Sequence, residues 1–103
     1  MSYIFTTTLY PNDKAAEVAK RYLEAIAKYP PDASLGTSIV PVAVKSTLQG
    51  IETITIIDVK KGKFEDSMLR VSNVLAMFND IQGYRSSTQV YMNLEEALKT
   101  TGM

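Results

Sequence analysis

The segment from Leu35 to Lys60, LGTSIVPVAVKSTLQGIETITIIDVK, decides the fold of this chain. It is rich in valine, isoleucine and threonine, which favour extended backbone. The tight turn Gln49-Gly50 divides it into two predicted strands, Leu35 to Leu48 and Ile51 to Lys60. The middle of the chain is therefore expected to form two successive strands with no helix between them.

The two strands are expected to take different places in a sheet. Pro41 lies in the middle of the first, and a proline cannot donate a ladder hydrogen bond, so this strand should lie at an edge or carry a bulge. The second strand contains Ile54-Thr55-Ile56-Ile57 and is apolar on both faces, which is typical of a central strand.

A strand and a helix are predicted before this segment, and a helix, a strand and a short helix are predicted after it. The β-branched and aromatic run from Tyr3 to Tyr10 predicts a strand, and Lys14 to Tyr29 predicts an amphipathic helix. After the segment, a second amphipathic helix is predicted at Phe64 to Ile81, a strand at Tyr84 to Met92 and a short final helix at Leu94 to Thr100. The order βαββαβ predicts a ferredoxin-like α+β fold, a single domain over residues 1–103 with a four-stranded antiparallel sheet. Right-handed crossovers place the first and third strands at its centre.

Composition removes several classes of function. The chain of 103 residues has no cysteine and no histidine, which excludes disulfides, thiolate catalysis and imidazole chemistry, and no metal site or cofactor is expected. Eleven basic residues balance eleven acidic ones, so neither nucleic acid nor an anionic membrane is an expected partner. No signal peptide precedes the first strand and no apolar run reaches the ~18 residues of a membrane span, which makes a cytoplasmic location the expectation.

The commonest RNA-recognition module shares this topology. That module stacks bases on aromatic side chains of the two central strands. The predicted third strand, Ile51 to Lys60, contains no aromatic residue, and the net charge is zero. RNA binding is therefore rejected.

Both long helices of this fold cover one sheet face and leave the other open. In the first strand, the more hydrophobic set Tyr3, Phe5, Thr7 and Leu9 is assigned to the core, which leaves Ile4, Thr6, Thr8 and Tyr10 on the open face. The last strand is expected to place Arg85, Ser87, Gln89 and Tyr91 there, and the third strand either Thr53, Thr55 and Ile57 or Ile54 and Ile56. Such a face has too few charges for a solvated sheet, so a second copy of the chain is expected to cover it, as a homodimer or higher oligomer.

The run from Gly83-Tyr84-Arg85 through Val90-Tyr91-Met92-Asn93-Leu94-Glu95-Glu96-Ala97-Leu98 is similar to the tail of uncharacterised members of the dimeric α/β-barrel group of small ferredoxin-like proteins. The resemblance covers the whole chain and implies two sheets packed face to face. It carries over no active-site residue. Members of the group that oxidise quinol-like substrates or bind haem often use histidine or tryptophan, and this chain has neither.

The candidate ligand-binding residues are Arg85, Gln89 and Tyr91 of the last strand, with Thr6 and Thr8 of the first. An arginine fork suits a carboxylate or phosphate, and the other side chains suit a small polar ligand. The simpler alternative is that Arg85 pairs with Glu52 or with an acid of a partner subunit. Glu52 and Asp58 are not a catalytic pair, because six residues of extended strand separate them by about 20 Å.

The sequence therefore predicts a small protein that forms a homodimer through its sheet face and binds a small polar or aromatic metabolite between the sheets. One alternative is a cofactor-independent monooxygenase or isomerase in the same cavity, activated by its own substrate, with Arg85 or Tyr91 steering charge. A further alternative is a regulatory module that binds an effector at a subunit interface. Whether the protein is an enzyme stays open at this point.

Overall fold

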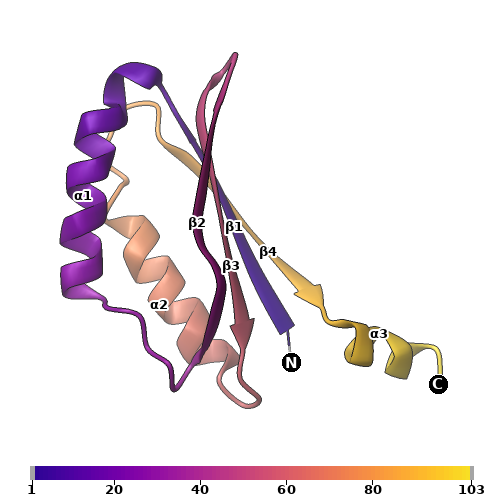
Figure 1. Cartoon of the computed structure of the whole chain (residues 1–103). Coiled ribbons are helices and arrows are strands. Elements are labelled where there is room, and N and C mark those ends of the chain that lie inside the picture. Colours follow the sequence, from indigo (N-terminus) through magenta and orange to yellow (C-terminus); the bar gives the residue numbers. More distant parts are fainter. Residues whose placement is uncertain (1, 103) are drawn as a thin grey trace.

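The computed structural model describes residues 2–102 (Figure 1). The strands are β1 (Ser2–Tyr10), β2 (Gly36–Thr47), β3 (Gly50–Val59) and β4 (Arg85–Met92). The helices are α1 (Ala15–Lys28), entered through the short 3₁₀ turn η1 (Asn12–Lys14), then α2 (Phe64–Ala76) and α3 (Leu94–Thr100). This order is the predicted ferredoxin-like βαββαβ arrangement followed by a short helix.

The sheet has the order β2-β3-β1-β4, and every neighbouring pair is antiparallel. The central position of β1 and β3 is as predicted. Pro41 confirms both halves of its prediction, because β2 is an edge strand and its register against β3 shifts between Ser38 and Val40 and again between Val40 and Ala43. The shifts accommodate a residue that has no amide proton to donate.

The turn between β2 and β3 depends on Gly50. Its φ angle of 139° lies in a region that side chains rarely adopt, and an added Cβ would come within 2.4 Å of the carbonyl oxygen of Tyr10. Thr47 closes the turn by donating its hydroxyl to the Gly50 carbonyl at 2.8 Å. The first residue of β3 is therefore a glycine because β1 passes directly beside it.

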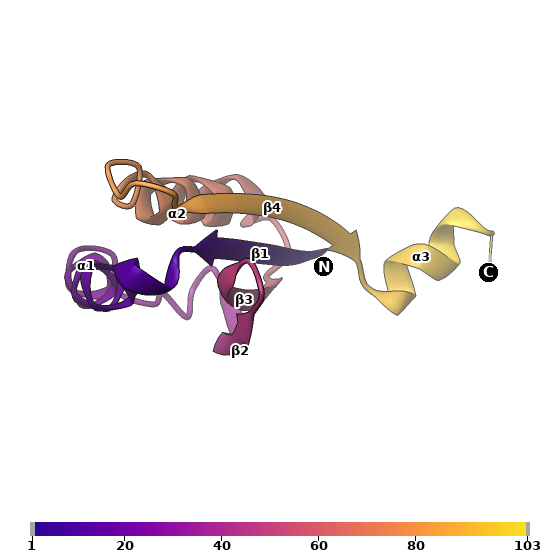
Figure 2. The same cartoon turned by 90° about the horizontal axis from the view of Figure 1, so that it is seen from above.

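Helices α1 and α2 lie on the same side of the sheet, and α3 projects from the end of β4 away from them (Figures 1 and 2). The buried apolar residues beneath α1 and α2 form two separate clusters. One contains Tyr10, Val18, Ala25, Phe78 and Ile81, and the other contains Ile4, Val59 and Val71. The helical layer therefore does not rest on one continuous core.

The prediction of which face of β1 is buried is wrong. Ile4, Thr6, Thr8 and Tyr10 are the buried set and face the helices, whereas Tyr3, Phe5, Thr7 and Leu9 are partly exposed on the open face. The error came from counting hydrophobic residues. Thr6 and Thr8 are accommodated beneath the helices because each lies opposite a threonine of β3, Thr55 and Thr53 respectively.

The register also resolves the face of β3 that the sequence left open. Phe5 and Thr7 lie opposite Ile56 and Ile54, so the two isoleucines are on the open face. Thr53, Thr55 and Ile57 face the helices instead.

The second long helix ends earlier than predicted. It stops at Ala76 rather than near Ile81, and the following amides of Met77, Phe78 and Asn79 bond to carbonyls three residues back. These tight turns bring Phe78 and Ile81 into the core, where both are buried. The apolar spacing in this segment therefore reflects burial by turns and not a longer helix.

The final helix α3 begins with the capping box that its sequence indicates. The Asn93 side chain accepts from the Glu96 amide at 2.8 Å, and the Glu96 carboxylate accepts from the Asn93 amide at 3.0 Å. Leu94 nevertheless remains largely exposed. Over the described part of the chain, no helix is both long enough and apolar enough to cross a membrane.

Candidate functional site

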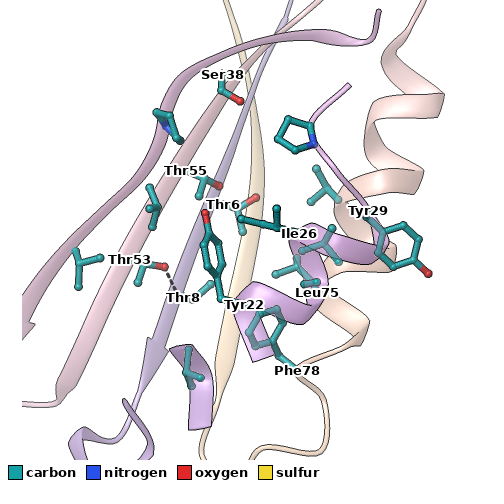
Figure 3. Close-up of a pocket in the computed structure, with 18 of the residues that line it drawn as sticks. Thr6, Thr8, Tyr22, Ile26, Tyr29, Ser38, Thr53, Thr55, Leu75 and Phe78 are labelled. Carbon is teal, nitrogen blue, oxygen red and sulfur yellow. Dashed lines mark hydrogen bonds between the residues drawn. The ribbon is translucent and has the colours of Figure 1, made fainter. Parts of the chain in front are cut away.

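A cavity of about 450 Å³ lies between the two long helices and the sheet (Figure 3). Residues of both apolar clusters line it. Its volume is within the range of cavities that hold small organic ligands. We call it the helix–sheet cavity.

The floor of the helix–sheet cavity is polar. It is made by Thr6 and Thr8 of β1 and by Thr53 and Thr55 of β3, which pair across the two central strands. Figure 3 shows a hydrogen bond between the hydroxyls of Thr8 and Thr53. The side chains of Thr6 and Thr55 lie beside this pair and also line the cavity (Figure 3).

Apolar and aromatic side chains form the rest of the wall. Tyr22 and Ile26 of α1 and Leu75 of α2 surround the threonine floor (Figure 3). These positions belong to the amphipathic stripes of their helices, which is why the sequence indicates only ordinary packing for them. The cavity arises because the two helices and the sheet leave space between those stripes.

One end of the cavity is closed by stacked aromatic rings. The ring of Tyr84 lies 4.8 Å from that of Phe78 and 5.9 Å from that of Tyr10, nearly parallel to both. Burial raises the pKa of the Tyr84 hydroxyl, and a hydrogen bond with Thr8 acts in the opposite direction. Tyr84 is therefore neutral at pH 7, and the aromatic end of the cavity is uncharged.

The cavity meets solvent between α1 and β2. Leu23 and Val44 line it and are 69% and 61% exposed, and Val42 beside them is also exposed. These three side chains form an apolar mouth of the cavity. At the opposite end from Tyr84, Arg70 lines both this cavity and a smaller adjoining one of about 310 Å³.

The residues predicted to bind ligand do not come together. Arg85, Gln89 and Tyr91 share the open face of β4, where the Tyr91 hydroxyl donates to Gln89 at 3.2 Å. Thr6 and Thr8 lie on the other side of the sheet, in the floor of the helix–sheet cavity. The sequence had grouped them because the face of β1 was assigned wrongly.

The charged residues of the open face are spread over its strands. Glu52 pairs with Lys45 of β2 at 3.7 Å, and no ion pair of Arg85 is found within residues 2–102. Asp58 lies at the far end of β3 from Glu52, as expected. In the same described range, no three acidic side chains gather closely enough to hold a metal ion.

Sequence reasoning missed the helical side of the cavity. The spacing of Tyr22 and Tyr29 is that of an ordinary buried helix stripe, and Arg70 belongs to no motif. The one available signal was the threonine content of β1 and β3, because alternate threonines on two adjacent central strands make a polar stripe inside the sandwich. The threonine content is visible in the sequence, but the stripe is recognised only when the strand register, which pairs Thr6 with Thr55 and Thr8 with Thr53, is known.

No protein-family model matches the chain, and no curated protein sequence matches it significantly. Solved structures do match in fold. A "putative antibiotic biosynthesis monooxygenase" from Deinococcus radiodurans has a TM-score of 0.59 at 13% identity, covering 90% of this chain and 92% of that one. The de novo designed protein Foldit4 has a TM-score of 0.54 at 13% identity, covering 89% and 96%. At such identities the likeness shows the ferredoxin-like fold alone.

Proposed function

We propose that this protein binds an apolar small molecule in the helix–sheet cavity. The observation that carries the proposal is the cavity itself, about 450 Å³ in volume, with apolar walls and a floor of four threonines. Burial of apolar ligand surface supplies affinity, and a few placed polar groups fix orientation. Thr6 and Thr55 supply hydroxyls suited to a hydroxyl or carbonyl group of the ligand.

Aromatic ligands fit the cavity best. The stacked rings of Tyr10, Phe78 and Tyr84 present a flat apolar end, and Tyr22 covers the floor from α1. Aromatic rings pack favourably against such walls in offset or tilted geometry. Of the two ligand classes predicted from the sequence, a polar or an aromatic metabolite, the proposal keeps the aromatic one and moves its site to the helix side of the sheet.

The test is a fluorescence titration with pyrenebutanamide, a neutral aromatic probe. Ala19 and Ala27 are both exposed alanines of α1, but only Ala19 lines the cavity. Ala19→Trp is expected to fill the mouth and weaken binding about tenfold or more, whereas Ala27→Trp is expected to bind as the wild type does. Absence of probe binding to the wild type, or equal affinity of both variants, would overturn the proposal.

The open sheet face supports a second part of the proposal, a homodimer formed face to face. Apolar side chains cover much of this face and surround Thr7, namely Tyr3, Phe5, Leu9, Ile54, Ile56 and Tyr91. Its charges are two basic and two acidic, Lys45 and Arg85 against Glu52 and Asp58. A second copy therefore matches the face in hydrophobicity and meets no net repulsion.

Sedimentation velocity of the wild type tests this part directly. A dimer whose fraction rises with protein concentration is the expected result. A monomer at every concentration would contradict the homodimer while leaving the ligand cavity unaffected, since that cavity lies within one chain. If a dimer forms, we propose that a ligand also binds between its two sheets, near Arg85, Gln89 and Tyr91. Titration of an Arg85→Gln variant with the same probe tests this second site.

A second candidate function is oxidation of an electron-rich aromatic ligand by molecular oxygen in the helix–sheet cavity. The observation that favours it is the fold shared along most of both chains with the protein described as an antibiotic biosynthesis monooxygenase. With no histidine or cysteine in the chain, the substrate would supply the electrons. Oxygen uptake with a naphthohydroquinone that exceeds its spontaneous rate, and falls in Ala19→Trp, would support this candidate. A rate of oxygen uptake equal to the spontaneous rate would exclude naphthohydroquinones as substrates.

A further inference from the structure

We propose that the ligand of the helix–sheet cavity is a carboxylic acid whose apolar body lies over the threonine floor and whose carboxylate binds Arg70. The inference rests on the proposed binding function and adds the chemical class of the ligand. It starts from the composition of the wall. Arg70 is the one charged side chain among the described residues that line the cavity, and the others are apolar or carry hydroxyl groups.

A cavity with one cationic side chain in its wall favours a ligand that carries one negative charge. Coulombic attraction is stronger where apolar side chains replace water, and the planar guanidinium matches the geometry of a carboxylate. The cation also lies at one end of the cavity, opposite the uncharged stack of Tyr10, Tyr84 and Phe78. The cavity is therefore polar at one end and apolar at the other, as an amphipathic acid is.

The guanidinium of Arg70 is held in place but not saturated. Its Nε donates to the carbonyl oxygen of Pro30 at 3.2 Å, and its Nη2 donates to that of Tyr29 at 2.8 Å. Both acceptors are neutral, and no acidic side chain in residues 2–102 forms an ion pair with it. Nη1 has no hydrogen bond to the described protein groups, so it remains available to a ligand.

Asp32 keeps the acid group on the cavity side of Arg70. It lines the smaller adjoining cavity, and its carboxylate accepts from the Ser34 amide at 2.9 Å and from the Ser34 hydroxyl at 2.6 Å. These bonds, and to a smaller extent the charges of Arg70 and Lys63, lower the pKa of Asp32, which therefore stays ionised at pH 7. An anion that passed Arg70 would meet this negative charge, so the carboxylate is expected to stop at the guanidinium.

A purely structural role for Arg70 makes a different prediction. Its two bonds to backbone carbonyls tether the end of α1 to α2, and the loss of that tether lowers stability whatever the ligand. Only a ligand-binding role makes the protein distinguish an acid from its uncharged analogue. The measurement is therefore a comparison of two probes that differ in that group alone.

The probes are pyrenebutanoic acid and pyrenebutanamide, titrated by fluorescence against the full chain at pH 7. The wild type is expected to bind the acid about tenfold or more tighter than the amide, the usual effect of a charge-assisted hydrogen bond. Arg70→Gln is expected to lose this preference with the amide affinity unchanged. Lys20→Gln, which removes an exposed cation of α1 outside the cavity, is expected to keep it.

Each result decides the question. Equal binding of both probes to the wild type would overturn the carboxylate proposal and leave the binding function intact, whereas binding of neither would overturn both. If Arg70→Gln does not fold, the Arg70 Nε–H resonance of the wild type gives the same answer by NMR. A shift of that resonance with the acid but not with the amide supports the contact, and an identical response to both probes refutes it.

Discussion

Arg21 of α1 and Asp80, in the turns that follow α2, form a two-pronged ion pair, with Nη1 2.5 Å from Oδ1 and Nη2 3.1 Å from Oδ2. At the other end of the helical layer, Arg70 of α2 bonds to the two carbonyl groups that follow α1. The two helices are thus joined at one end by Arg21 of α1 and at the other end by Arg70 of α2. This arrangement holds α1 and α2 together above the helix–sheet cavity.

The Arg21–Asp80 pair predicts an acid-dependent contribution to stability. Its hydrogen bonds and charge lower the pKa of Asp80 in the folded protein. The stabilisation is therefore fully present above the ordinary aspartate pKa of about 3.9 and is lost as the pH falls through the lowered value. Asp80→Asn is expected to unfold at lower urea concentration than the wild type at pH 7, and this difference should shrink as the pH is lowered towards 2.

The control for this prediction is Asp13→Asn, which removes an exposed carboxylate outside the ion pair. It should change the urea midpoint far less at pH 7. Because Asp80 is largely exposed, the effect is expected to be small, and denaturation in high salt should reduce it further. A difference between Asp80→Asn and the wild type that persists unchanged at pH 2 would contradict an electrostatic origin.

The β2–β3 turn predicts unequal costs for two glycine substitutions. Gly50→Ala places a Cβ against the backbone oxygen of Tyr10, so it should lower the free energy of unfolding by more than about 2 kcal/mol. Gly62 also has a positive φ, of 78°, but no atom within 4 Å of an added Cβ. Gly62→Ala should therefore cost only the left-handed backbone term of about 1 kcal/mol, measured by urea denaturation. Equal costs would show that the contact with β1 relaxes freely.

The sequence predicted the order of elements because each depends on local spacing and turn residues. Pro41 is the clearest case, since a missing amide proton restricts a strand to an edge or a bulge in any fold. The face of β1 was not predictable in the same way. Thr6 and Thr8 are polar by composition, and only their pairing with Thr55 and Thr53 places them inside. The candidate site depends on that pairing and on α1 standing away from the sheet, which no local pattern encodes.

Loss of the capping box is expected to destabilise α3 without lowering the stability of the whole protein. Asn93→Ala removes the acceptor for the Glu96 amide, which typically costs a helix about 1 kcal/mol. Since α3 projects from the end of β4, its backbone amides should exchange hydrogen about fivefold faster while the thermal midpoint of the whole protein stays the same. Asn73→Ala in α2 is the control and should leave exchange in α3 unchanged. A drop in the thermal midpoint on Asn93→Ala would mean that α3 is coupled to the core.

The last prediction concerns dimerisation through the open face of the sheet, with probe binding on the helix side of the same sheet as the reference. Ile54 of β3 points to the open face, where a lysine would place an uncompensated charge inside the proposed dimer interface. Ile54→Lys is expected to shift the protein to monomer in sedimentation velocity, with at least about a tenfold weaker dimer, and to leave probe binding in the helix–sheet cavity intact. Ser72→Lys, on the exposed side of α2, should change neither property. A dimer that survives Ile54→Lys unchanged would contradict a subunit contact through the open face, because Ile54 lies on one of its two central strands.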